Sequence, residues 1–357
     1  MSEWYLEEDE LDDVQHAVYD LPTDQDILVE GSAGSGKTLL ALHRAHKLHE
    51  DGENFKFLVF TNALKQFIRK GIEELGLPED CITTEGRWHG GRTGHLVVDE
   101  VQDFDKRDIE RFKDSCDHLH LFGDSYQQIY EDFRQTTTFD EIEKIMGGQI
   151  RKRLLRFNYR LPKNIAKVAV STRHWQAHLS DADQSGRDFV ENCKNEGESY
   201  AYHKSFESEE GELKFLGKYV NSESRSRKVA ILVPYNRMVK KTYEYLNSLD
   251  IPCEVRYKRE DEGEGGQEEG DDHVDTLDFS TSNIKILTWH SSKGLQFESV
   301  ILPFMKGMGK DAITDFGWIE AAYVALTRSY RNLMITYEGV RTAFLKTADE
   351  EILKKYQ

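Results

Sequence analysis

Short apolar runs alternate with longer amphipathic stretches along this 357-residue chain. In the first half, four runs have the length and composition of buried strands: DILVE (26–30), FKFLVF (55–60), HLVVDE (95–100) and HLHLFGD (118–124). The stretches between the first three are long enough for crossover helices, which parallel strands require. The pattern therefore predicts an α/β architecture built on a parallel sheet.

A second set of apolar runs follows in the second half of the chain. These runs are KVAILVP (228–234), IKILTW (284–289), ESVILP (298–303) and NLMITY (332–337). A glycine pair, Gly147 and Gly148, lies between the two sets. The layout predicts two doubly wound domains with parallel sheets, one over residues 1–150 and one over residues 151–357.

The charge is strongly negative but unevenly distributed. Asp and Glu number 65 against 47 Lys and Arg, which gives a net charge of −18. Residues 1–13 hold seven of the acids and residues 260–278 hold ten, and neither segment has a Lys or Arg. The rest of the chain is nearly neutral, so it can still carry a basic groove. Because segment 260–278 is also rich in glycine, we expect it to be a mobile loop.

Membrane and disulfide-rich classes are disfavoured. No apolar stretch approaches the roughly 20 residues of a membrane span, and the acidic amino terminus does not resemble a secretory signal. We therefore expect a cytoplasmic protein without a membrane partner. Its four cysteines (Cys81, Cys116, Cys193 and Cys253) are far apart and form no Cys/His cluster. They are predicted to be reduced, mostly buried thiols rather than zinc ligands or disulfides.

A phosphate-binding loop follows the first predicted strand. The sequence GSAGSGKT fits the pattern GxxxxGK[ST] and leads into the helical run LLALHRAHKLH. In this context the loop's backbone N–H groups wrap phosphates at a helix amino terminus, Lys37 reaches the β and γ oxygens, and the Thr38 hydroxyl binds Mg²⁺. The predicted nucleotide-binding residues are Gly31, Ser32, Ala33, Gly34, Ser35, Gly36, Lys37 and Thr38.

Two further strands end in polar residues suited to phosphoryl transfer. The run HLVV ends in Asp99 and Glu100. An aspartate there can hold magnesium, and the next glutamate can orient and deprotonate an attacking water. A third strand ends in GDSYQQIY (123–130), where Gln127 could sense the γ-phosphate from the crevice at the carboxyl ends of the strands.

Taken together, these motifs resemble those of superfamily 1 helicases of the UvrD/Rep type. LDDVQ (11–15) resembles the Q motif, VFTNAL (59–64) motif Ia, VVDEVQDF (97–104) motif II and GDSYQQIY motif III. RFNYR (156–160) resembles motif IV, TWHSSKGLQF (288–297) motif V and YVALTR (323–328) motif VI. The resemblance implies two tandem RecA-like domains with one ATP in the cleft between them, hydrolysed with Mg²⁺.

The same resemblance assigns roles in nucleotide binding and catalysis. Gln15 would read adenine, with Arg44 and Tyr159 beside the base. Arg160 and Arg328 would approach the γ-phosphate from the second domain. In motif V, Gly294 and Gln296 would contact the nucleotide, and Gln296 stands where a glutamate commonly meets the ribose.

Nucleic-acid contacts are also implied by motif position. Thr61, Asn62, Thr288 and His290 would touch the backbone of a single strand. Trp88 and His89 could supply stacking, and Phe133 is the aromatic nearest to the position of a tryptophan that stacks on a base in the family. Core packing remains an alternative for Trp88, and a structural role for His290. Segment 260–278 is either a solubilising insertion or an acidic flap that competes with nucleic acid.

Two functions follow from the resemblance. The first is an ATP-driven translocase or helicase on single-stranded DNA; RNA stays open because backbone contacts alone do not separate the polymers. The second is an ATPase switch in a larger DNA-repair or anti-phage defence complex, whose protein partner supplies a nuclease or another effector. The accessory subdomains of the family look absent, since only residues 65–96 separate motif Ia from motif II. A minimal core favours the second function more than a full-length relative would.

Overall fold

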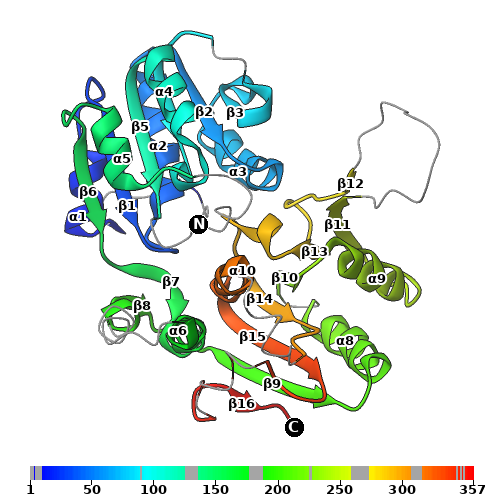
Figure 1. Cartoon of the computed structure of the whole chain (residues 1–357). Helices are drawn as coiled ribbons and strands as arrows, with labels where there is room; N and C mark the ends of the chain where they lie inside the picture. The colour runs from blue at the N-terminus through cyan, green and yellow to red at the C-terminus, as the bar shows by residue number, and fades with distance from the viewer. Residues whose placement is uncertain are drawn as a thin grey trace. The chain divides into compact units, whose positions relative to one another are not determined.

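The computed structural model describes residues 4, 10–88, 91–124, 136–176, 188–224, 227–258, 273–306, 316–342, 345, 348 and 350–357. By its internal contacts the chain divides into two units, Met1–Arg160 and Leu161–Gln357, coloured blue to green and green to red in Figure 1. Each unit contains a largely parallel sheet flanked by helices. The α/β class predicted from the sequence is therefore confirmed.

The first unit is built on a six-stranded parallel sheet with the order β3-β2-β4-β5-β1-β6. Its strands are β1 (Ile27–Gly31), β2 (Phe55–Val59), β3 (Ile82–Thr84), β4 (Thr93–Val98), β5 (Cys116–Gly123) and β6 (Arg151–Leu155). Its helices are α1 (Asp13–Tyr19), α2 (Lys37–Glu50), α3 (Asn62–Glu74), α4 (Lys106–Ser115) and α5 (Phe139–Ile145). The four strands predicted in this half are all present.

Alternate residues of these strands enter two separate cores. Val29, Phe57 and Val97 pack with α2 and α3 on one face, whereas Leu28 and Leu58 belong to the core with α4 and α5. Helices therefore cover both faces of the sheet, which explains why its inner strands read as continuous apolar runs. The carboxyl ends of β1, β4 and β5 meet at one edge of this sheet.

The first unit ends at Arg160, ten residues after the boundary at residue 150 that was predicted from the glycine pair. Strand β6 pairs in parallel with β1 and so extends the first sheet beyond residue 150. Its sequence, RKRLL, did not resemble a strand because most of its side chains are exposed. Strand β7 (Asn158–Pro162) then carries the chain out of the first unit.

The second unit is built on an eight-stranded sheet with the order β12-β11-β13-β10-β14-β15-β9-β16. Its strands are β9 (Tyr200–Phe206), β10 (Val229–Val233), β11 (Cys253–Lys258), β12 (His273–Asp275), β13 (Ile284–Thr288), β14 (Phe297–Leu302), β15 (Ser329–Glu338) and β16 (Lys354–Lys355); β7 and β8 (Cys193–Asn195) form a small separate sheet. Its helices are α6 (Lys163–Gln176), α8 (Glu209–Glu223), α9 (Asn236–Asn247) and α10 (Phe316–Leu326). The four predicted strands correspond to β10, β13, β14 and β15.

The prediction of a mobile loop over 260–278 is wrong for its last residues. Strand β12 pairs antiparallel with β11, and Arg256 forms an ion pair with Asp275 across the two strands. The Asp278 backbone N–H then donates to the Glu254 carboxylate at 2.6 Å. Pairing with β11 orders 273–278 in spite of their charge, whereas residues 260–272 lie outside the described ranges.

Two other expectations concern membrane-spanning helices and the cysteine thiols. None of the helices within the described ranges is long and apolar enough to cross a membrane. The four cysteines are free, and all except the half-buried Cys253 are buried, as predicted. Burial raises the pKa of each of these thiols to about 12, so they are unreactive at neutral pH.

Candidate active site

The loop between β1 and α2 has the backbone geometry of a phosphate cradle. Gly34 and Gly36 adopt φ values of 79° and 92°, in the left-handed region that favours glycine. A Cβ atom on Gly34 would lie 2.5 Å from the Asn158 side-chain oxygen, and one on Gly36 would lie 2.7 Å from the Gln15 amide nitrogen. Helix α2 begins directly afterwards at Lys37, so its first backbone N–H groups lack helical partners. Such a loop can bind an anion.

Lys37 brings a positive charge to this loop. Its side chain is buried, and the ammonium donates to the backbone oxygens of Gly31 at 2.7 Å and Ser32 at 2.9 Å. The ammonium is therefore held against the cradle rather than extended into solvent. From this position it can neutralise phosphate oxygens that approach the loop.

Thr38 and Asp99 form a pair of oxygen donors beside the loop. The Thr38 hydroxyl donates to the Asp99 carboxylate at 2.7 Å, and Asp99 is fully buried at the end of β4. Burial, with the neighbouring charge of Glu100, raises the pKa of Asp99 to about 7. A divalent cation would offset the repulsion between the two carboxylates.

The donor chemistry of this pair fits Mg²⁺. Magnesium is commonly held by one or two protein oxygens together with waters and substrate phosphates. Among the described residues, no group of three or more His, Cys, Asp and Glu side chains could hold a metal. Thr38 and Asp99 supply two such oxygens, so waters and the phosphates of a nucleotide would complete the coordination of Mg²⁺.

Glu100 occupies a strained backbone position next to Asp99. Its φ of 58° is unusual for a residue with a side chain, and the side chain is buried. The Glu100 N–H donates to the Asp99 carboxylate at 3.0 Å, and the Asp103 N–H donates to the Glu100 carbonyl at 3.0 Å. Non-glycine residues in this region cluster at functional sites, where surrounding contacts maintain the strain.

Gln102 is a site residue that sequence reasoning missed. Its amide nitrogen donates to the Glu100 carboxylate, and its amide oxygen accepts from the Asp124 backbone N–H at 2.9 Å. One buried amide thus joins the ends of β4 and β5. The signal was available, because Gln102 lies within the quoted motif VVDEVQDF, two positions after Glu100.

The segment after β6 lies against the phosphate-binding loop. The Tyr159 backbone N–H donates to the Gly34 carbonyl at 2.9 Å, and Arg160 is the second neighbour that a Cβ on Gly34 would meet, at 2.6 Å. The Asn158 side chain accepts from the Arg160 N–H at 3.0 Å and so shapes this turn. Arg160 belongs to the first unit, which corrects the expectation that it approaches from the second domain. Arg160 lies in β7 at the end of this unit, where residues 158–160 contact Gly34 of the loop.

Helix α1 meets the same loop through Gln15. The Gln15 amide donates to the Ser35 carbonyl at 3.1 Å, while Asp12 caps the helix by accepting from the Gln15 N–H at 2.8 Å. The Tyr159 hydroxyl donates to the Asp12 carboxylate, and burial together with this bond raises the pKa of the phenol. The Tyr159 ring stays partly exposed. Gln15 and Tyr159 are thus both tied to the phosphate-binding loop, and their contact with adenine stays a prediction.

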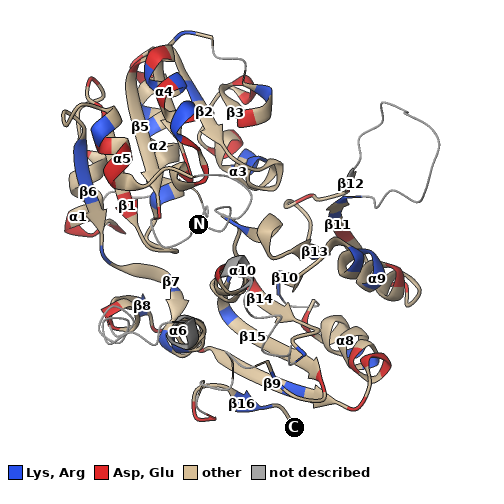
Figure 2. Ribbon diagram, viewed as in Figure 1, with Lys and Arg blue, Asp and Glu red and all other residues tan. Residues whose placement is uncertain are grey.

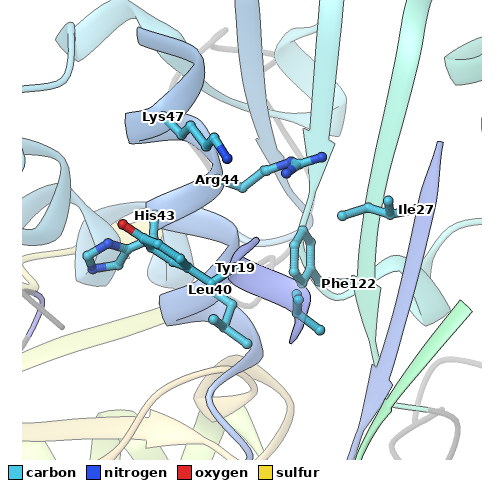
Figure 3. A pocket seen from close by; sticks show the side chains of 8 residues that line it. Tyr19, Ile27, Leu40, His43, Arg44, Lys47 and Phe122 are labelled. Carbon is cyan, nitrogen blue, oxygen red and sulfur yellow. The ribbon is translucent and has the colours of Figure 1, made fainter. Parts of the chain in front are cut away.

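Arg44 is buried in the α2 face of the sheet. Its guanidinium donates to the backbone oxygens of Leu21 and Pro22, in the segment that connects α1 to β1. Figure 3 shows its side chain together with Leu40, Ile27 and Phe122 around a small pocket with room for about one water molecule. This geometry gives Arg44 a role in positioning α1; direct contact with a base stays a prediction.

A ladder of buried histidines extends from Arg44 across the neighbouring strands β5 and β4. The Arg44 Nε donates to the His120 ring at 3.4 Å, His120 and His95 share a hydrogen bond of 3.1 Å, and His95 lies 3.7 Å from the Glu53 carboxylate. The His118 ring stacks on His95 at 5.2 Å. Burial lowers the pKa of His95 and, with the charge of Arg44, holds the pKa of His120 well below its ordinary value.

This ladder predicts a loss of stability in mild acid. Because both pKa values are lower in the folded than in the unfolded state, the two histidines bind protons only on unfolding. Their contribution is complete above the unfolded pKa of about 6.5 and is lost as the pH falls below it, by up to about 1.4 kcal/mol per pH unit for each group. Urea titrations between pH 7.5 and 5.0 should show this slope, and His120→Asn should reduce it. An unchanged slope in the variant would contradict the assignment.

In the second unit, motifs V and VI come together through Arg328. Its side chain is buried, and its guanidinium donates to the Leu295 carbonyl at 3.2 Å and to the Val324 carbonyl at 2.9 Å. Leu295 lies between the predicted site residues Gly294 and Gln296, and Gly294 has a φ of 77°. Arg328 therefore contacts the segment that contains Gly294 and Gln296 through the Leu295 carbonyl between them.

The predicted nucleic-acid residues are placed in varied surroundings. Thr61 caps α3 by accepting from the Leu64 N–H at 3.1 Å, and Asn62 is the first residue of that helix. The Thr288 hydroxyl accepts from the Ser291 N–H at 3.1 Å, and His290 follows it, half-buried, in a 3-10 turn. Each of these groups lies at the carboxyl end of a strand.

Trp88 packs in the core. Only 8% of its surface is exposed, and its ring lies 5.4 Å from that of Phe112. This placement supports the alternative of core packing. Three predicted residues, His89, Phe133 and Gln127, lie outside the described residues.

Comparison with known proteins gives distant structural likenesses. No protein-family model and no curated protein matches the sequence. One similar solved structure is the C-terminal domain of a possible DNA helicase from Lactobacillus plantarum WCFS1, with 12% identity and a TM-score of 0.39 over 56% of this chain and 99% of that chain. Another is the PRRSV helicase, with 15% identity and a TM-score of 0.44 over 90% of this chain and 54% of that chain. At these TM-scores neither likeness bears on the chemistry of the site.

Proposed function

We propose that this chain hydrolyses ATP with Mg²⁺ and couples the hydrolysis to movement along single-stranded nucleic acid, as UvrD-like helicases and translocases of superfamily 1 do. The observation that carries the proposal is the meeting of three features in the first unit. The Lys37 ammonium, the hydrogen-bonded pair of Thr38 and Asp99, and the buried Glu100 converge beside a glycine-rich loop. This set matches the requirements of phosphoryl transfer to water.

Each residue has a distinct task in this proposal. The backbone N–H groups of the loop and Lys37 bind the phosphates and stabilise the charge that develops on them. Thr38 and Asp99 would hold Mg²⁺, which supplies a Lewis acid to the β- and γ-phosphate oxygens. Glu100 orients the attacking water and accepts its proton. The Gln102 amide fixes the direction of the Glu100 carboxylate.

The surroundings of the loop suit adenine and the γ-phosphate. Gln15 is hydrogen-bonded to Ser35, and the exposed Tyr159 is hydrogen-bonded to Asp12. Both side chains therefore lie near the loop, where they can contact a base. Arg160 follows directly and is assigned to the γ-phosphate, where its permanent charge suits a transferring phosphoryl group. The second unit enters the proposal through the family resemblance, which assigns Arg328, Gly294 and Gln296 to the same nucleotide.

The proposal is tested by measuring phosphate release with different polymers. We expect slow basal turnover that single-stranded DNA increases, with RNA as the comparison and blunt duplex DNA as the poor activator. Strand displacement on a tailed duplex then separates unwinding from translocation. Lys37→Ala is the control for contaminating ATPases, since it should abolish all turnover.

The alternative function gives a different result in the same assay. Turnover that ignores every polymer would contradict the coupling to nucleic acid and favour a switch that responds to a protein partner. Absence of turnover under all conditions would contradict the whole proposal.

A further inference from the structure

An exposed aromatic residue marks the carboxyl end of β10 in the second unit. Tyr235 follows this strand directly before α9, and 40% of its surface is exposed. The strand itself is fully buried. A large ring left in solvent at the end of a buried strand lies where open α/β sheets bind ligands.

The Arg237 guanidinium stacks over the Tyr235 ring, so the two side chains form a cation–π pair. The guanidinium carbon lies 5.1 Å from the centre of the Tyr235 ring, within the range of a cation–π contact. Both side chains are exposed. Within the described parts of the chain, Arg237 forms no ion pair, so its charge remains available to an anion.

The pair adjoins two other features of the same unit. Val233, two residues before Tyr235, accepts a hydrogen bond of 2.9 Å from the Trp289 N–H, so the carboxyl ends of β10 and β13 lie together. Thr288 ends β13 at this point. On the other side, the Lys258 backbone N–H donates to the Asn236 side chain at 3.3 Å, so the end of β11, where the exposed Lys258 lies, adjoins the start of α9.

We infer that Tyr235 and Arg237 form a stacking site for a base of single-stranded nucleic acid, with Lys258 facing the adjoining phosphates. The inference rests on the proposed function and adds residues that its motifs do not include. Figure 2 marks Lys and Arg residues of α9 and β11 in blue, with acidic residues of α9 in red. The carboxylates of an acidic peptide could pair with the two cations but would not stack on the Tyr235 ring. Every nucleotide supplies both a phosphate for the cations and a base for the ring.

The test compares binding of two labelled oligonucleotides by fluorescence anisotropy at low salt. One is oligothymidylate, and the other is an abasic strand of the same length that keeps the phosphates. Tyr235→Ala should weaken oligothymidylate binding about 5- to 160-fold, the range typical of a lost base stack, and should leave abasic binding unchanged. Tyr235→Phe, which keeps the ring, should bind nearly as wild type does. Arg237→Ala should weaken the binding of both strands.

Leu249→Ala is the matched control. Leu249 is also an exposed apolar residue of the same unit, and it lies just beyond the other end of α9. Leu249→Ala should leave the binding of both strands and basal ATP hydrolysis unchanged.

Three outcomes would overturn the inference. If Tyr235→Ala and wild type bind oligothymidylate with equal affinity, the inference is wrong. Stimulation of wild-type ATP hydrolysis by DNA would still support the proposed function. A Tyr235→Ala loss that persists on the abasic strand would exclude base stacking. A wild-type protein that hydrolyses ATP but binds neither strand would remove the inference together with the coupling to nucleic acid, and would leave the hydrolysis itself standing.

Discussion

Glu100→Gln should lower ATP hydrolysis about a hundredfold or more while ATP binding is retained. The expected size is that of losing a general base, which contributes typically 10²- to 10⁴-fold. Glutamine has nearly the same shape as glutamate, so the left-handed backbone at position 100 and the contact with Gln102 can persist. What disappears is the ability to accept a proton from the attacking water. Phosphate release under saturating ATP measures the effect, and titration with a fluorescent ATP analogue measures the binding.

Two further variants test whether the loss of turnover is specific to the Glu100 carboxylate. Glu110→Gln makes the same chemical change on an exposed face of α4 and should leave turnover unchanged. Gln102→Ala keeps the Glu100 carboxylate but removes the amide that orients it, so it should reduce turnover less than Glu100→Gln does. Near-normal turnover in Glu100→Gln would remove Glu100 from the role of base, whatever the other variants show.

The meeting of these residues could be predicted from sequence because they belong to contiguous motifs. The glycine-rich loop is flanked by a strand and a helix, and Asp99 and Glu100 end another apolar run. Parallel strands place their carboxyl ends along one edge, so these segments had to meet. The contact between Gln102 and Asp124 could not be predicted in this way, because it depends on side-chain directions at the ends of two strands.

The boundary between the units could not be predicted for a different reason. Edge strands carry charge that protects them from pairing with other chains, so they lack the apolar pattern of inner strands. Strand β6 has Arg151, Lys152 and Arg153 in succession and pairs with β1 alone. Because β6 was missed, the predicted boundary at residue 150 fell ten residues before Arg160, the last residue of the first unit. The structure places Arg160 beside Gly34, and its contact with a phosphate stays a prediction.

Gly34→Ala should weaken ATP binding at least about tenfold. Two effects act at this position. A side chain at φ 79° is strained, at a cost of roughly 1–2 kcal/mol. The new methyl group would also lie 2.5 Å from the Asn158 side-chain oxygen and 2.6 Å from the Arg160 Cβ, too close for either to remain in place. The variant therefore displaces the segment that carries Tyr159 and Arg160 from the phosphate-binding loop.

Gly52→Ala separates the two effects. Gly52 has nearly the same φ, 74°, but a Cβ there would meet no atom within 4 Å. This control should lose stability through backbone strain alone and should keep its affinity for ATP. The measurement is the shift in thermal unfolding temperature on adding ATP, because a ligand stabilises the folded state according to its affinity. Wild type and Gly52→Ala should show equal shifts, and Gly34→Ala a much smaller one. Equal shifts in all three proteins would mean that the contact between Gly34 and residues 158–160 has no part in binding the nucleotide.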